Sequence, residues 1–592
     1  MSKKNNKLAI LFTLLLFSLN SLFAFNNNQK IEHIDSDLYD GIKDLYLAQS
    51  LAMPSAAAPY SDSELIMMLD LLDTSKFSKA DANVYKYIKE SLTQDEKNTN
   101  KYSKINWDVD LNLESYIHQN TTDFVRRENF IYNFLDQKPL INIGFEAWMG
   151  ENFYGLGNFS IASTYTTETT FGSETISHNI VGLPPNQIFD LDFNFPYRGF
   201  LAFGGDTWSL EIGRDRTKWG HGISSNLMIG DNLPYLDELR YTTFSNQFKY
   251  TFITSFFPHP QNYIAGDPTE GLGQSDPTQG TRAFIAHRGE GRLFNNKVGI
   301  AISESIMYQS LDNVLDLRYL SPAALFHNFY IRANANSLLS LELDYTPFKN
   351  FNIYAQGVMD EFALPGEPYP GGSKQAFPNA FGYIAGVKYN YDVLNKYKGN
   401  TTFEFAHTDP YLYLRGDGTS NMAAQTADEY AINYVVAFRE FASHGTWYHN
   451  EFLGYKYGGD AIVFNLNSSV KNYGKWNIET NLFYMLHGTF DKFTCWNSIA
   501  PGTPTDQYIT PTTSHDNSDT TNTIGSREPS SNIADRDSVS QTLVLGASAS
   551  YNVNKNLSCF VQLDYININN YQNVSGEKTS DMQLVLSLSY SL

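Results

Sequence analysis

Strand-length segments in which apolar and polar residues alternate recur along most of this chain. From Ile105 to Leu113 every second residue is apolar, and the pattern returns at 339–345, 476–484 and 582–592. Successive side chains of a β-strand point to opposite faces, so each segment has one apolar and one polar face. A closed membrane barrel suits both faces, because lipid meets the apolar side and no unpaired edge remains in hydrocarbon. The repetition predicts a large antiparallel transmembrane β-barrel.

The composition agrees with a barrel and argues against other classes. Aromatic residues make up 15% and hydrophobic residues 42% of the 592 residues, yet the mean hydropathy is −0.35. A helical membrane protein would be far more apolar, and after the N-terminus the sequence has no run long enough for a membrane helix. The net charge of −21 argues against binding nucleic acid. At roughly 10 residues per strand plus turns, the chain has room for about 16 to 18 strands.

The N-terminal region is predicted to hold an export signal and a helical domain. Residues 1–24 place three lysines ahead of an apolar run, which is typical of a signal peptide; the alternative is a membrane anchor. Residues 25–102 are expected to form three helices in the periplasm, because apolar residues recur at helical spacing from Leu38 and Ser61 begins a capping box. The sequence leaves open whether this domain docks against the barrel or forms an independent linker.

Residues 103–592 are predicted to form the barrel, with short periplasmic turns and long polar loops outside. Residues 162–194 are expected in one loop, and 496–540, rich in Thr, Ser, Pro, Asp and Asn, in another. The last strand ends at Leu592 and resembles the signal read by the barrel-assembly machinery, with leucine replacing the usual terminal aromatic. The expected partners are therefore outer-membrane lipid and that machinery.

The alternation fails after Gly213. If the strand continued, Arg214 and Arg216 would face lipid, where an arginine near the bilayer midplane costs about 2–4 kcal/mol. Two glycines follow within 217–222, so the chain is predicted to turn into the lumen. The candidate residues for ligand binding or a lumen constriction are Arg214, Arg216, Lys218, Trp219, His221, Asp231 and Asn232. Two interpretations stay open: a polar patch that binds a ligand or sets pore selectivity, and a structural network with Glu211, Asp237, Glu238 and Arg240.

Three groups of short motifs occur in order along the chain. They are Gly213-Arg214 with Trp219–Gly222 and Leu227–Asn232, then Tyr319–Pro322 with Asn336–Leu339 and Asp360–Phe362, and then Phe452–Ala461. Together they resemble the capsule assembly protein Wzi family, over the helical region and most of the barrel. The resemblance implies a non-enzymatic outer-membrane barrel that binds surface polysaccharide and helps it associate with the membrane.

Aromatic side chains beside polar groups would suit sugar binding, because rings stack on sugar faces. Candidates are Tyr369, Tyr411, Tyr413, Trp447 and Tyr448; the alternative for each is the aromatic girdle of a membrane barrel.

The second candidate function is a channel for small polar or anionic solutes, with Arg214, Arg216 and Lys218 at the constriction. No nucleophile elbow or His-Glu-x-x-His motif is present, so no catalytic residue, metal or cofactor is expected. The sequence does not decide whether Cys495 and Cys559 pair.

Overall fold

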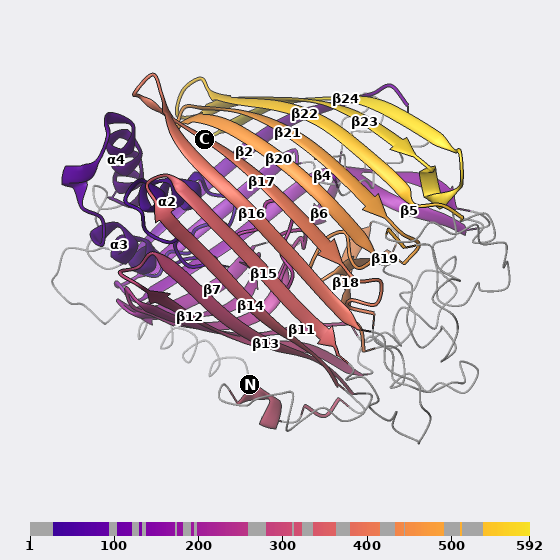
Figure 1. Ribbon diagram of the computed structural model, residues 1–592, viewed down its shortest axis with the longest axis horizontal. Coiled ribbons are helices and arrows are strands. Elements are labelled where there is room, and N and C mark those ends of the chain that lie inside the picture. Colours follow the sequence, from indigo (N-terminus) through magenta and orange to yellow (C-terminus); the bar gives the residue numbers. More distant parts are fainter. Residues whose placement is uncertain are drawn as a thin grey trace, which may run out of the picture.

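Eighteen described strands close into one antiparallel barrel in the computed structural model (Figure 1). The structure describes residues 28–93, 103–120, 130–132, 138–171, 174–181, 191–194, 198–258, 280–310, 313–315, 317–321, 335–362, 379–414, 432–442, 445–490, 510–511 and 537–592. The predicted signal peptide, Cys495 and most of 496–540 lie outside these residues. The strand number falls within the predicted range, and the predicted fold class is confirmed.

Neighbouring wall strands pair in chain order, and the last strand pairs with the first, which closes the barrel. Leu588 lies opposite Leu113 at this closure. The wall strands are β2 (Ser103–His118), β3 (Ile141–Met149), β4 (Phe153–Phe171), β7 (Gly199–Gly205), β8 (Trp208–Asp215), β10 (Leu236–Phe244), β11 (Phe248–Phe257), β12 (Thr281–Leu293), β13 (Val298–Ser310), β14 (Ala335–Phe348), β15 (Phe351–Glu361), β16 (Ala380–Val393), β17 (Tyr397–Thr408), β20 (Ala461–Asn472), β21 (Trp476–His487), β22 (Ser540–Asn552), β23 (Leu557–Asn569) and β24 (Lys578–Ser591).

Four shorter elements differ from plain wall strands. β5 (Glu174–Val181) and β6 (Leu191–Asn194) pair with the outer part of β4, so the expectation of a single loop over 162–194 is wrong. The segment is rich in threonine, a β-branched residue that is frequent in strands, so it can continue the sheet. β18 (Val435–Ala442) and β19 (Gly445–Phe452) form a separate hairpin.

The burial pattern of the wall strands is the reverse of the pattern in a soluble protein, because apolar side chains are exposed and charged ones are buried. On β14 the apolar side chains Leu341 and Leu343 are 49% and 46% exposed, while Glu342 and Asp344 between them are 6% and 4% exposed. Apolar side chains that face outward from strand after strand require lipid around the barrel. The alternation predicted from sequence is therefore confirmed, with its polar face toward the lumen.

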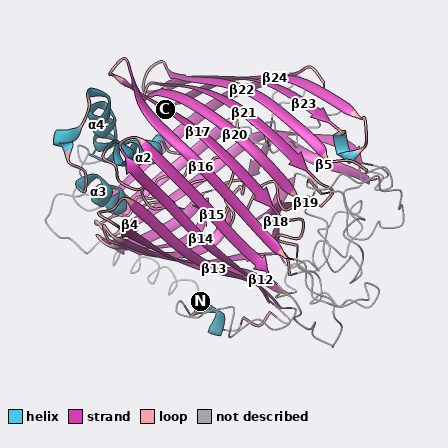
Figure 2. Cartoon of the chain, viewed as in Figure 1, coloured by secondary structure: helices cyan, strands magenta, loops and turns pink. Residues whose placement is uncertain are grey.

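Three helices pack at the short-turn end of the barrel (Figure 2): α2 (Asp37–Ala48), α3 (Asp62–Asp70) and α4 (Lys79–Thr93). Ser61 caps α3 by accepting a hydrogen bond from the Glu64 N–H, as the capping box predicts. Within the described residues no helix is both long and apolar enough to cross a membrane.

The helices dock against the barrel through charged groups. Lys471 on β20 lies 3.2 Å from Asp37 and 2.6 Å from Asp40, and Lys398 on β17 lies 2.6 Å from Asp81. Burial raises the pKa of Asp40, but Lys471 and other lysines lower it more, so it stays below its usual range. These contacts settle the alternatives left open by the sequence in favour of a docked helical region.

Candidate functional site

The chain leaves the wall after β8 and crosses the lumen before it returns at β10. We call residues 216–235 the lumen loop. Its β9 (Lys218–Trp219) pairs with β1 (Ala57–Ala58), which lies between α2 and α3 in sequence. The Trp219 N–H also donates to the Ile229 carbonyl at 3.1 Å, which folds the loop back on itself. The chain thus turns inward just after Gly213, at the position where the alternation of the sequence fails.

Arg214 lies at the end of β8 and forms an ion pair within the wall. Its guanidinium donates two hydrogen bonds to Asp237 of β10, at 2.7 and 2.9 Å, and lies 3.8 Å from the centre of the Tyr235 ring. A bidentate pair with a stacked ring fixes the guanidinium plane and neutralises its charge. Arg214 is therefore held by the wall where the lumen loop begins.

Arg216 connects the lumen loop with the N-terminal region. Its guanidinium contacts Asp35 at 2.5 Å and donates to the Asp231 carbonyl at 2.6 Å. Burial raises the pKa of Asp35, but Arg216, His33 and Lys218 together lower it more, so the carboxyl stays ionised. Asn232 donates its side-chain N–H to the Phe452 carbonyl at 3.0 Å. Asp231 and Asn232 thus hold their neighbours in place.

The remaining predicted residues lie deeper in the lumen. Trp219 is fully buried, and the Arg288 guanidinium lies 5.9 Å from its ring centre. Lys218 takes part in β9 through its backbone. The His221 ring lies 6.5 Å from the Tyr354 ring, beside a cavity of about 20 Å³ that has room for about one water molecule. His221 therefore lines the same cavity as Arg288 and Arg292.

Glu404 on β17 anchors the tip of the lumen loop to the opposite wall. It accepts hydrogen bonds from the backbone N–H groups of Ile223 and Ser224 at 2.8 and 2.9 Å, and from the Ser224 and Tyr354 hydroxyls. The Tyr413 hydroxyl also holds the loop, because it donates a hydrogen bond to the Leu227 carbonyl. Sequence reasoning missed Glu404, because it is one of many acids on inward faces and nothing local distinguishes it.

A second segment, residues 51–61, enters the lumen from the short-turn end; we call it the N-terminal strap. The Met53 N–H donates to Asp344 at 2.7 Å, and the Ser55 hydroxyl donates to Glu290 at 2.9 Å. Lys249 donates to the Ala57 carbonyl at 2.7 Å. Because β1 also pairs with β9, the strap and the lumen loop meet inside the barrel.

Buried ion pairs on the inner wall surround the strap. Glu211 and Glu238 pair with Arg240 rather than with Arg214 or Arg216, which corrects that part of the predicted network. The lumen arrangement therefore supports the structural interpretation of the charged cluster. Within the described residues no cluster of acids, histidines and cysteines is arranged to hold a metal ion.

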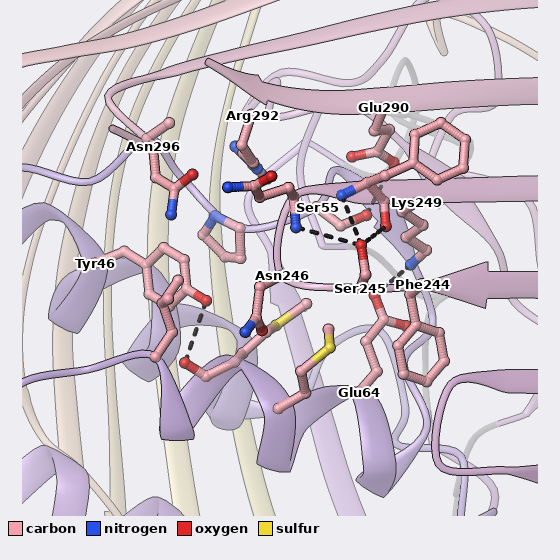
Figure 3. Close-up of a pocket in the computed structure, with 17 residues that line it drawn as sticks. Tyr46, Ser55, Glu64, Phe244, Ser245, Asn246, Lys249, Glu290, Arg292 and Asn296 are labelled. Atoms are coloured by element: carbon pink, nitrogen blue, oxygen red, sulfur yellow. Dashed lines mark hydrogen bonds and ion pairs between the residues drawn. The ribbon is translucent and has the colours of Figure 1, made fainter. Parts of the chain in front are cut away.

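A cavity of about 40 Å³ lies at the seam between α3 and the barrel (Figure 3). Lys249 extends from β11 to Glu64 of α3 at 2.6 Å, and Glu290 and Arg292 lie nearby (Figure 3). Burial raises the pKa of Glu64, and Lys249 opposes that rise. Each charged side chain lining the cavity has an opposite charge beside it. The cavity therefore presents no unpaired charge to a ligand.

Of the predicted sugar-binding rings, two can be placed. Tyr413 is fully buried in the lumen core, so it offers no ring face to a surface sugar. Tyr411 is half-buried at the long-loop end, with its ring 5.0 Å from that of Phe490. Tyr369 and the side chains of Trp447 and Tyr448 lie outside the described part of the chain.

A closed barrel with an apolar outer wall, short turns at one end and long connections at the other defines an integral protein of the bacterial outer membrane. No protein-family model and no curated protein matches this chain. Among solved structures, its fold is similar to that of Wzi, described as an outer membrane protein involved in group 1 capsule assembly in Escherichia coli and a carbohydrate-binding β-barrel. The TM-score is 0.55 at 12% identity, over 94% of this chain and 98% of that one.

Two channels are more distantly similar. OccD3 (OpdP) of Pseudomonas aeruginosa has a TM-score of 0.38 at 8% identity, over 82% of this chain and 91% of that one. The outer membrane channel DcaP of Acinetobacter baumannii has a TM-score of 0.32 at 7% identity, over 83% of this chain and 99% of that one. At these identities the comparisons show a shared fold with Wzi, and the two channels are too distant to bear on function.

Proposed function

We propose that this protein is a non-enzymatic outer-membrane barrel that binds a surface polysaccharide at its long-loop end and helps to hold it at the membrane. The observation that carries the proposal is the lumen loop, which crosses the barrel and is pinned to the far wall through Glu404. A barrel whose lumen is crossed by anchored segments is suited to binding at its rim. The shared fold with Wzi, itself described as carbohydrate-binding, supports the same conclusion.

The channel alternative requires a free cationic constriction. Arg214 is paired with Asp237 and Arg216 with Asp35, so two of the three basic groups proposed for it are neutralised. That pairing supports a structural role for the cluster.

Binding to the polysaccharide of the source cell tests the proposal directly. The purified full-length protein is titrated with surface polysaccharide extracted from that cell, and binding is measured by calorimetry. The Tyr411→Ala variant is expected to bind about 5- to 150-fold more weakly, because loss of a stacked ring removes about 1–3 kcal/mol. The matched control is Tyr389→Ala, which removes an exposed tyrosine near the short-turn end of β16.

Two results would contradict the proposal. One is the absence of binding by the wild-type protein, together with unchanged surface retention of polysaccharide in a deletion strain. The other is a large, steady conductance of the wild-type protein in planar bilayers, which would favour the channel.

A further inference from the structure

The inner wall of the barrel has two sectors that differ in how their carboxylates are neutralised. On β12 and β14, which we call the paired sector, Arg288 contacts both Glu290 and Glu342, and Arg292 lies 3.2 Å from Asp344. These side chains are buried beneath the N-terminal strap, and Arg288 is only 2% exposed. Each acid of the paired sector is therefore buried, and an arginine neutralises its charge.

The opposite sector comprises the short-turn halves of β2, β3 and β21–β24, and we call it the open sector. Asp108, Asp110, Glu146 and Glu479 lie on its inner face and are half-exposed. Their described partners are neutral: a serine hydroxyl reaches Asp110 at 2.6 Å, a tyrosine hydroxyl reaches Glu146 at 2.6 Å, and an amide reaches Glu479 at 2.7 Å. Among the side chains that the structure describes, no lysine or arginine pairs with any of these four acids.

The exposure of these acids places water inside the barrel. Trp107 and Leu111, which alternate with them on β2, are 67% and 38% exposed on the outer face, so the acids between them point inward. On the other side, the N-terminal region bonds to the turns at Asn296, Asn350 and Lys396. It also reaches the borders of the open sector, where the Tyr473 hydroxyl donates to Asp44 of α2 and the Asn28 N–H donates to the Glu151 carbonyl. Figure 1 shows the helices against the ends of β12–β17. The access to the open sector that we infer therefore lies between these borders, at the short-turn ends of β22–β24.

The upper end of the open sector is apolar and closed by ring packing. Phe130 stacks on Phe483 with ring centres 6.4 Å apart, and Tyr132 donates to Glu114. Two amides lie on the inner face at this level, Asn465 on β20 and Gln583 on β24, 5% and 0% exposed. Their side-chain carbonyl oxygens are buried and lack a hydrogen-bond donor among the described residues. A buried acceptor without a donor is costly, so this end of the sector favours a ligand that donates hydrogen bonds.

We propose that the open sector is a water-filled vestibule that binds an organic cation with several ammonium groups, such as an aliphatic polyamine. Four carboxylates without a described counter-charge attract cations, and low-dielectric walls focus that field. The acids are spread over β2, β3 and β21, and no described group of three converges on a metal. Spaced ammonium groups match spaced carboxylates, and their N–H groups supply donors to the amide oxygens. The proposal stands independently of the polysaccharide role.

Cysteine labelling of the full-length protein tests whether the vestibule exists and which charge it admits. In a Cys495→Ser/Cys559→Ser background, Ser548→Cys places a thiol on the half-exposed inner face of β22. The control, Ser340→Cys, places one on the inner face of β14, where the serine is 2% exposed. We expect a cationic methanethiosulfonate to modify position 548 about tenfold faster than an anionic one, after correction for their rates with a free thiol. Both reagents should react slowly at position 340.

Spermine protection then tests binding. Spermine is expected to slow modification of position 548, and the Asp108→Asn/Glu479→Gln variant is expected to lose both the protection and the preference for the cationic reagent. The control variant Asp70→Asn/Glu90→Gln removes the same charge from exposed helix positions and should keep both. If neither reagent labels the thiol at position 548, the vestibule is overturned. If the two reagents react there at equal rates, its preference for cations is overturned. Equal protection by magnesium at the same ionic strength, or none by spermine, overturns the polyamine assignment.

Discussion

Removing the Glu404 side chain is expected to release the lumen loop and open a conducting path. In the Glu404→Ala variant the N–H groups of Ile223 and Ser224 lose the acceptor that they share among the described residues. A buried donor left without an acceptor costs about 1–3 kcal/mol. That cost applies to Ser224, which is 5% exposed, whereas Ile223 is 38% exposed and its N–H can bond to water instead. The Ser224 hydroxyl keeps a partner in Tyr455, 3.0 Å away, and adds little to the loss. The pinned state should therefore be disfavoured by a factor of about 5 to 150.

Single-protein recording in planar bilayers measures this release directly. Wild-type protein should stay closed for most of the record, and Glu404→Ala should show long openings. Glu404→Gln keeps one acceptor oxygen at the same place and should fall between the two. Thr402→Ala, also on the inner face of β17 and 3% exposed, is the matched control and should behave as wild type. A folded Glu404→Ala protein that stays closed would refute the idea that this carboxylate holds the loop.

Three further predictions follow from the lumen and the docked helices. Gly220→Ala brings a Cβ within 2.1 and 2.2 Å of two amide groups at a φ of +134°, so it should lower the urea midpoint of unfolding more than Gly289→Ala, where a Cβ meets open space. Because the pKa of Asp40 is depressed in the folded state, the stability that its pairing with Lys471 contributes is fully present above about pH 4 and declines progressively as the pH falls from there toward the folded pKa. Hydrogen exchange in α2, corrected for intrinsic rate, should therefore rise below about pH 4, and exchange in the Asp40→Asn variant should be high on both sides of that pH. Arg214→Gln should lower folding yield but leave polysaccharide binding within about twofold, and a selective loss of binding would reinstate Arg214 as a ligand residue.

The candidate site was only partly predictable. The failure of alternation after Gly213 located the lumen loop, because arginines on a lipid face are costly and glycines allow a turn. Its partners were not predictable: the Ile223 N–H bonds to a carboxylate 181 residues away. Arg216 likewise reaches Asp35, far outside the segment from which its partners were inferred.

The pairing of strands and the role of individual rings also depended on context. Tyr411 and Tyr413 are two residues apart and look alike in sequence, yet one is half-buried at the long-loop end and the other is sealed in the core. The residues at 162–194 have the composition of a loop but extend the sheet, because β4 offers them an edge to pair with.

The sequence by itself determined that this chain forms a membrane barrel, since a period of two is a local property that each strand carries without reference to the others. It also determined the helices that precede the barrel, through spacing and capping residues. Only the tertiary structure decided the fate of the inward acids. Glu342 and Asp110 occupy equivalent places in the pattern, but one is buried against an arginine and the other meets water and neutral groups. Closure of the barrel and the path of the N-terminal strap set that difference, because both bring together residues hundreds of positions apart.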